Sequence, residues 1–184
     1  MRVIEKLLAI LLVCIPASSM AAQTQVASEI SLSGIKIAAT TTVNADANVL
    51  WATLTDYNNL ASFVPGMTLS RLVPSTKPGV KLVELKGEGG LVALILPDHF
   101  FLAMEERPYD YIGFRSVSGS GGMMQGEWVI TGSRSPVQLS YRATVVPLFP
   151  PSPMVSDGYV QNGTRLRLDA VSREAEKRMR SPPK

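Results

Sequence analysis

The chain has 184 residues, of which 46% are hydrophobic and 18% charged, and its formal net charge at pH 7 is +3. This size predicts one domain with a sizeable core, and the small charge excess argues against a nucleic-acid-binding protein. The single cysteine and single histidine exclude a disulfide framework and the zinc sites that are rich in these residues.

The first residues have the pattern of an export signal. Arg2 and Lys6 give a basic start, the run Leu7–Ile15 is apolar, and the small residues near Ala21 fit the rule for signal cleavage. The run is shorter than the roughly 20 residues that span a membrane. We therefore predict a cleaved signal peptide at 1–22, which places the protein in the periplasm or outside the cell.

The next segments alternate between strand and helix patterns. We expect a flexible stretch at 23–29, a domain over 30–180 and a disordered tail at 181–184. Residues 30–43 are rich in β-branched side chains and predict a strand. A short helix is then predicted from Ala47 to Thr55, because apolar residues recur there at helical spacing, namely Val49, Leu50, Trp51 and Leu54.

The stretch TDYNNLASFVPGM, which follows this helix, predicts a second short helical piece. A helical turn or two from Tyr57 to Phe63 would direct Leu60 and Phe63 inward. The Pro65-Gly66 pair would then stop the helix and start the next strand.

Several strands separated by turn residues make up the middle of the chain. The predicted strands are 67–73, 80–86, 99–107, 111–118, 123–131 and 137–146, with a further short apolar run at 91–96. The last strand alternates most clearly, since the even positions from Gln138 to Thr144 are polar and the odd positions from Leu139 to Val145 are Leu139, Tyr141, Ala143 and Val145. This alternation is typical of an antiparallel strand with one face in water.

A long helix is predicted from about Val155 to Arg180. Its apolar residues form two stripes at spacings of three and four, which are Val160, Thr164, Leu168, Val171, Ala175 and Met179, and Val155, Tyr159, Gly163, Leu166 and Ala170. Two stripes indicate apolar surroundings on two sides, so that one closes a cavity and the other packs on the sheet or the short helices. A break of the helix at Asn162-Gly163 is the alternative.

The segment VNADANVLWATLTDYNNLASFVPGMTLSRLV, with the later IGFRSVSGS, QGEWVI and AVSREAEKR, resembles the polyketide cyclase/dehydrase and coenzyme Q-binding START-like family. The resemblance covers Ser31 to Arg178. It implies an α+β helix-grip fold, in which a curved antiparallel sheet of about six to seven strands surrounds a long C-terminal helix, with two short helices after the first strand. It also implies an apolar cavity between sheet and helix. Unlike many relatives, this chain carries an export signal, so a cytoplasmic role, such as quinone service at the inner face of a respiratory membrane or contact with the ribosome, is not expected.

The sequence contains no catalytic constellation. His99, at the start of a strand, is expected to form ordinary turn hydrogen bonds. Glu105 and Glu106 are neighbours on a strand, so they point to opposite faces and do not meet at one substrate. Asp56 is expected to end a helix. We therefore predict no catalytic residue, no cofactor and no metal site.

These features favour an exported, soluble binding or carrier protein for a hydrophobic small molecule, such as a lipid, a quinone or a polyketide-like compound. Two alternatives stay open, a cyclase or dehydratase acting on a polyketide-like chain, and a protein-interaction module. We expect a monomer without a nucleic-acid partner, and transient contact with a membrane surface through the basic C-terminal helix. The predicted ligand-binding residues are Trp51, Phe101, Ile112, Phe114, Met124, Trp128, Leu139, Tyr141, Tyr159 and Leu166.

Overall fold

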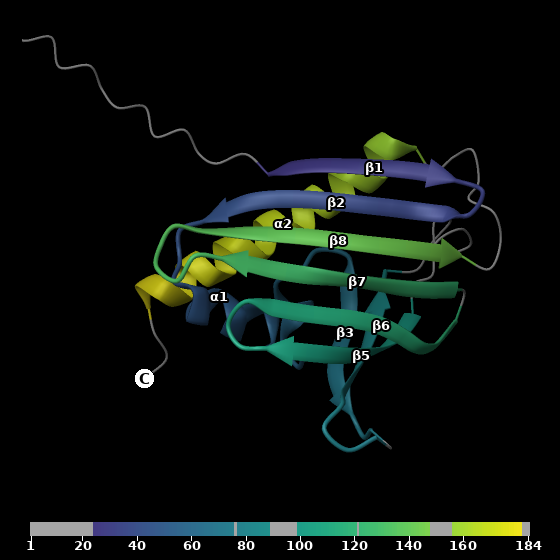
Figure 1. Ribbon diagram of the computed structural model, residues 1–184, viewed down its shortest axis with the longest axis horizontal. Helices are drawn as coiled ribbons and strands as arrows, with labels where there is room; N and C mark the ends of the chain where they lie inside the picture. The colour runs from purple at the N-terminus through teal and green to yellow at the C-terminus, as the bar shows by residue number, and fades with distance from the viewer. Residues whose placement is uncertain (1–23, 76, 89–98, 121, 148–155, 182–184) are drawn as a thin grey trace, which may run out of the picture.

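An antiparallel sheet with one long helix packed across a single face dominates the structure (Figure 1). The structure is a computed structural model, and it describes residues 24–75, 77–88, 99–120, 122–147 and 156–181. The elements are β1 (Gln25–Ser31), β2 (Gly34–Val43), α1 (Ala47–Leu54), the 3-10 helix η1 (Leu60–Ser62), β3 (Met67–Val73), β4 (Lys81–Gly87), β5 (His99–Arg107), β6 (Tyr111–Ser120), β7 (Gly122–Thr131), β8 (Val137–Pro147) and α2 (Asp157–Arg180). The predicted signal peptide, the apolar run at 91–96, Val155 and the end of the predicted tail lie outside the described residues.

The sheet has the strand order β1-β2-β8-β7-β6-β5-β4-β3, and every neighbouring pair is antiparallel. Strands β2 and β8 are far apart in the chain, yet they pair from Ile35↔Val145 to Val43↔Val137. After β2 the chain passes through α1 and η1 to reach β3 at the opposite edge. Figure 1 shows β3 turned steeply relative to β1 and β2, so the sheet curves around α2.

The sheet has eight strands in place of the predicted six or seven, because residues 25–31 form β1. This segment, expected to be mostly flexible, pairs with β2 from Gln25↔Thr40 to Ser31↔Gly34. Gly34 has a φ of 134°, a conformation that favours glycine, and it divides the predicted strand 30–43 in two. Strand β1 lies at an edge and is largely polar, so it carries little of the apolar alternation that identifies strands.

Local sequence explains where α2 begins and ends. The Ser156 hydroxyl caps the helix by accepting a hydrogen bond from the Tyr159 backbone N–H at 3.2 Å. Basic residues occupy its last turn, where cations interact favourably with the helix dipole. The helix continues through Asn162-Gly163, so the predicted alternative of a break there is wrong. Neither helix in the described part of the chain is both long and apolar enough to cross a membrane.

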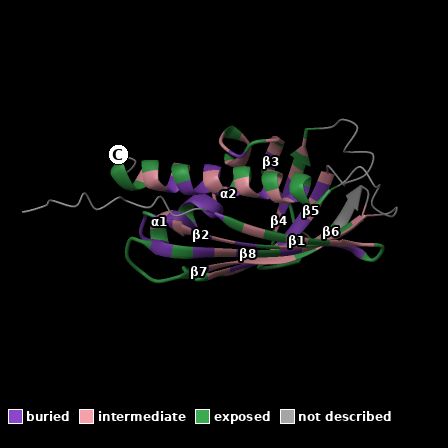
Figure 2. Ribbon diagram, turned by 90° about the horizontal axis from the view of Figure 1, so that it is seen from above, coloured by how far each residue is buried: buried purple, intermediate pink, exposed green. Residues whose placement is uncertain are grey.

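Helix α2 buries mainly one of its two apolar stripes. Its buried residues face the sheet in Figure 2, and they include Val160, Thr164, Leu168, Val171 and Ala175. In the other stripe Ala170 is buried, but Tyr159 is 51% exposed and Leu166 is 47% exposed. The prediction that both stripes lie in apolar surroundings is therefore wrong for Leu166, which faces solvent because the single sheet contacts only one side of α2.

The short helices fill one end of the space between sheet and α2. Leu50, Trp51 and Leu54 of α1 are buried in a cluster with residues of β2, β7, β8 and α2. After η1, Gly66 has a φ of 73° and directs the chain into β3, as the Pro-Gly pair predicts. The second helical piece is thus a single 3-10 turn, and the cluster leaves the other end of the interior unfilled.

Candidate functional site

A cavity of about 370 Å³ lies between the inner face of the sheet and α2. Strands β2 to β8, α1 and the segment after it, and α2 all contribute lining residues. Helix α2 presents Gly163 and Thr164 to this space, and a Cβ built on Gly163 would have no atom within 4 Å. Small side chains in the N-terminal half of the helix therefore help to keep the cavity open.

Aromatic side chains from three adjacent strands form one wall. The ring centroids of Trp128 and Tyr141 are 4.3 Å apart, and Phe114 stacks with Tyr141 at 6.1 Å. Gly126 is required beside them, because a Cβ there would lie 2.5 Å from the Phe114 ring. Its bare backbone lets Phe114 lie flat across the sheet, which gives the cavity a smooth apolar surface.

Polar side chains are a minority in the cavity, and α2 supplies three of them, Tyr159, Thr164 and Arg167. Tyr141 is only 8% exposed, and burial raises the pKa of its phenol to about 12, against the opposing effect of the positive charge of Arg167. Arg167 extends from α2 and also lines the cavity. We define the mouth of the cavity by Glu88, Tyr159 and Arg167, which are three of the exposed residues that line it.

Tyr57, from the TDYNNLASFVPGM stretch, lines the cavity with its ring and uses its hydroxyl elsewhere. The hydroxyl donates to Glu106 Oε1 at 2.7 Å, and the other Glu106 oxygen pairs with Lys81 Nζ at 2.8 Å. Burial, and secondly this carboxylate, raise the pKa of Tyr57. The Ser70 hydroxyl bonds to the Tyr57 carbonyl. These bonds fix the corner between η1 and the sheet, so Tyr57 has a structural role.

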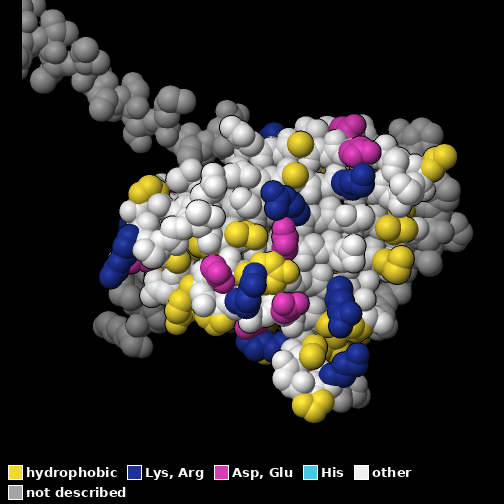
Figure 3. Space-filling model, viewed as in Figure 1, with side chains coloured by type: hydrophobic (Ala, Val, Ile, Leu, Met, Phe, Trp, Pro, Cys, Tyr) yellow, Lys and Arg dark blue, Asp and Glu magenta, His cyan; other side chains and the backbone are white. Residues whose placement is uncertain are grey.

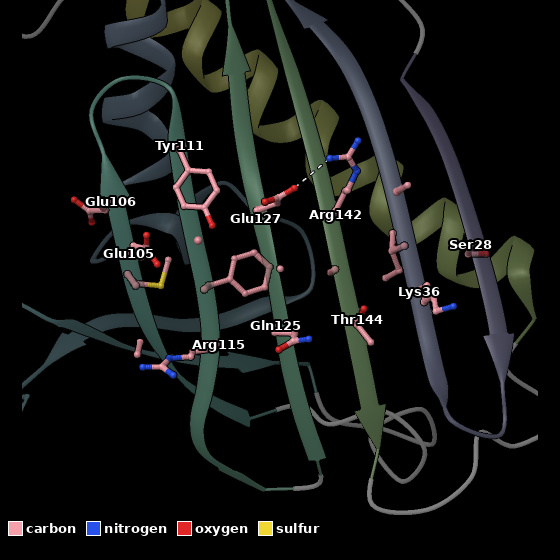
Figure 4. Close-up of a pocket in the computed structure, with 18 of the residues that line it drawn as sticks. Ser28, Lys36, Glu105, Glu106, Tyr111, Arg115, Gln125, Glu127, Arg142 and Thr144 are labelled. Carbon is pink, nitrogen blue, oxygen red and sulfur yellow. Dashed lines mark hydrogen bonds and ion pairs between the residues drawn. The ribbon is translucent and has the colours of Figure 1, made fainter.

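A wider hollow of about 1130 Å³ lies on the outer face of the sheet (Figure 4). Its labelled side chains belong to cross-strand rows, one of which runs from Glu105 through Gly113 and Glu127 to Arg142. Glu127 accepts a hydrogen bond from Arg142 at 3.1 Å. Figure 3, which looks onto this face, shows basic and acidic side chains interleaved. The outer hollow is therefore a solvated polar surface, and the inner cavity is the candidate site.

The only histidine of the chain lies away from the inner cavity. His99 Nε2 is 3.0 Å from Glu84 Oε1, and Arg71 binds the other oxygen of this carboxylate at 2.6 Å. Hydrogen bonds, first from Arg71 and then from His99, lower the pKa of Glu84 although burial opposes them. His99 thus has the ordinary hydrogen-bonding role that was predicted. No group of three or more potential metal-ligating side chains was found within the described ranges.

Six of the ten predicted ligand-binding residues line the cavity: Ile112, Phe114, Met124, Trp128, Tyr141 and Tyr159. The other four lie elsewhere. Trp51 and Leu139 are buried in the cluster beside α1. Phe101 pairs with Glu84 and so faces the outer side of the sheet, and Leu166 is on the exposed side of α2. Contact of the six with a ligand stays a prediction.

Sequence analysis missed Arg167, Thr164 and Gly163 as lining residues. Gly163 and Thr164 did belong to the two apolar stripes, and their small size was an available signal. Arg167 lies between the stripes in a helix with many basic residues. Nothing in its local sequence distinguishes it from the cations that face solvent.

Comparisons with known proteins agree with this geometry. A model of the family described as polyketide cyclase/dehydrase and lipid transport matches residues 43–171. No curated protein is significantly similar in sequence. Human StAR-related lipid transfer protein 5 has a TM-score of 0.69 at 11% identity, with 90% of each chain covered.

Two bacterial structures are also similar. The Zhui aromatase/cyclase from Streptomyces sp. R1128 has a TM-score of 0.63 at 21% identity, over 79% of this chain and 96% of that one. The STAR-related lipid transfer protein from Xanthomonas axonopodis has a TM-score of 0.64 at 12% identity, over 83% and 93%. At such identities the likeness shows the fold alone, and it confirms the predicted α+β helix-grip architecture.

Proposed function

The chain belongs to the polyketide cyclase/dehydrase and lipid transport family, and from that premise we propose that it binds and carries a hydrophobic small molecule between the sheet and α2. The observation that carries the proposal is the cavity of about 370 Å³, with its aromatic wall and few polar groups. Small-molecule sites are mostly concave, apolar and about 300–1,000 Å³ in volume. Lipids, quinones and polyketide-like compounds are all candidate ligands for such a site.

Native mass spectrometry after incubation with lipids, quinones and polyketide-like compounds tests the proposal. We expect one bound ligand per chain from at least one class. Phe114→Asp should abolish uptake, because it places a charge on the aromatic wall. A surface change such as Lys177→Gln should leave uptake intact. Failure of the folded wild-type protein to take up any compound would contradict the proposal.

A cyclase or dehydratase acting on a polyketide-like chain is the second candidate. One observation favours it, since the Tyr141 hydroxyl adjoins the cavity and is a candidate proton donor. His99 cannot share this role, because it bonds to Glu84 on the outer face. The wild-type protein would then turn over a polyketide-like chain, and Tyr141→Phe would lose this turnover while it still binds the ligand. This pair of results would establish the enzyme. Equal turnover in both proteins would exclude Tyr141 as its acid.

We further propose that residues 1–22 are an export signal and that the mature protein is a monomer in the periplasm or medium. The sequence pattern supports export, and the mass of the protein recovered from the cell envelope or medium tests it. Light scattering tests the monomer. A protein that keeps Met1–Ala22, or a dimer, would contradict these points.

Transient contact with anionic membranes through α2 is also proposed. Arg178 pairs with Asp56 and Glu174, and Lys177 pairs with Glu174, so part of the basic excess is neutralised within the protein. Exposed Arg173 and Arg180 remain for lipid contact, at about 1 kcal/mol per cation near the surface. Sedimentation with anionic vesicles should fall in the Arg173→Gln/Arg180→Gln variant, and equal sedimentation would contradict the proposal.

A further inference from the structure

The hydroxyl of Tyr141 is a hydrogen-bonding group without a partner in the described part of the chain. Tyr141 is more than nine-tenths buried, and it lines the cavity. Among the described residues, every side-chain nitrogen or oxygen that is inaccessible to solvent has a hydrogen-bond partner. The Tyr141 hydroxyl must therefore adjoin open space, and the space beside this residue is the cavity.

Arg167 places a positive charge near this hydroxyl. Its Nε donates to the Pro65 carbonyl at 3.5 Å, which is a long and weak bond. None of the ion pairs formed among the described residues involves its guanidinium. Its charge nevertheless influences Tyr141, whose pKa it lowers against the effect of burial. The cavity thus has an apolar body and one cationic end.

The other charged lining residues differ from Arg167. Lys86 lies two residues after Glu84 on β4, so its side chain points to the outer face of the sheet. Glu88 is exposed, and its backbone N–H donates to the Gly66 carbonyl at 2.9 Å, which fixes one side of the mouth. Glu88 is the one acidic group among the described lining residues, and it should weaken the binding of an anion.

We propose that the cavity selects amphiphiles with an anionic head group, in which the head pairs with Arg167 and an oxygen of the same ligand accepts a hydrogen bond from Tyr141. This inference rests on the proposed function and adds the chemical class of the ligand. The planar guanidinium forms two parallel hydrogen bonds with a carboxylate, which makes such pairs strong and selective. The aromatic wall and the apolar strand residues then cover the ligand's chain.

Three amphiphiles with the same alkyl chain test the inference: dodecanoic acid, dodecan-1-ol and dodecyltrimethylammonium. Their affinities are measured by calorimetry at neutral pH, below the concentrations at which they form micelles. The wild-type protein should bind the acid at least about tenfold more tightly than the alcohol, a difference of about 1.4 kcal/mol, and should bind the cation least.

Variants assign the selectivity to individual residues. Arg167→Gln should bring the acid and the alcohol to similar affinity, whereas Arg167→Lys should keep part of the preference. Lys177→Gln, on the same helix but outside the cavity and paired with Glu174, is the matched control and should behave as wild type. Tyr141→Phe should weaken both acid and alcohol about fivefold, because one hydrogen bond is lost. Glu88→Gln should strengthen binding of the acid only.

The outcomes separate this inference from the proposed function. Equal affinity of the wild-type protein for acid and alcohol would overturn the anionic ligand class and leave hydrophobic binding intact. A preference for the acid that persists in Arg167→Gln would overturn the role of Arg167. If the folded protein binds none of the three amphiphiles, the proposed function fails for simple alkyl ligands and the inference fails with it.

Discussion

Replacing Gly163 with leucine should block the cavity and at the same time stabilise the protein. Gly163 lines the cavity in the N-terminal half of α2, and a Cβ there would meet open space. Leucine favours a helix over glycine by about 0.8 kcal/mol. In a domain of this size such a change raises the melting temperature by about 2–4 °C. Most cavity-blocking changes would instead destabilise the fold.

The same leucine should weaken ligand binding through the volume it occupies. If it displaces two or three methylene groups of a ligand, each worth about 0.8 kcal/mol, the affinity falls by about 2 kcal/mol, or roughly 30-fold. Thermal denaturation and calorimetry with the dodecyl amphiphiles measure the two effects. Asn162→Leu is the matched control, because Asn162 is the preceding residue, is exposed and does not line the cavity.

Either of two results would refute this reasoning. If Gly163→Leu binds as tightly as wild type, the space beside Gly163 is not the binding site. If it is less stable than wild type, the added side chain meets protein and the space is not open. Asn162→Leu should retain full affinity, and a loss there would indicate that leucine disturbs α2 at any position.

Three further predictions concern α2 and the outer face. Leu168→Ala should lower the free energy of unfolding by about 2–5 kcal/mol in urea, because Leu168 is 1% exposed and packs against the sheet. Leu166→Asp, on the exposed side of α2, should change it by less than about 0.5 kcal/mol, and equal losses in these two variants would contradict the packing described. Acid should destabilise the protein partly through Glu84, whose pKa lies below its ordinary value of 4.5 because of hydrogen bonds from Arg71 and His99. A carboxyl group with a lowered folded pKa stabilises the protein above its unfolded pKa, and this contribution is lost as pH falls through the folded pKa. The loss of stability between about pH 7 and about pH 3 should therefore be smaller in Glu84→Gln than in wild type, and an equal loss would show that Glu84 contributes nothing.

The order and type of most elements followed from local sequence. The alternation in 137–146, the helical spacing in 47–55 and the Pro65-Gly66 stop each depend on residues close together in the chain. Such patterns fix which side of a strand or helix is apolar before any tertiary contact forms. The resemblance carried by residues 31–178 then supplied the arrangement of these elements.

Tertiary structure decided the features that depend on distant segments. Strand β1 has too little apolar alternation to be identified alone, and it is ordered by pairing with β2. Trp51 and Leu139 carried the same apolar signal as Trp128 and Tyr141. The former pair is buried beside α1, whereas the latter lines the cavity. Trp51 belongs to α1 and packs in one cluster with Leu139, whereas Trp128 and Tyr141 face the part of the interior that α1 does not fill.

The sequence by itself determined that this protein has an apolar sheet face and an amphipathic helix to cover it. Whether the two surfaces meet or leave a space depends on the summed volumes of side chains from seven strands, α1, η1 and α2, which no local pattern records. The proximity of Tyr141 on β8 to Arg167 on α2 likewise arises only when α2 lies across the sheet. Short-range periodicity therefore fixes the faces of the elements, and only long-range packing creates the cavity and its cationic end.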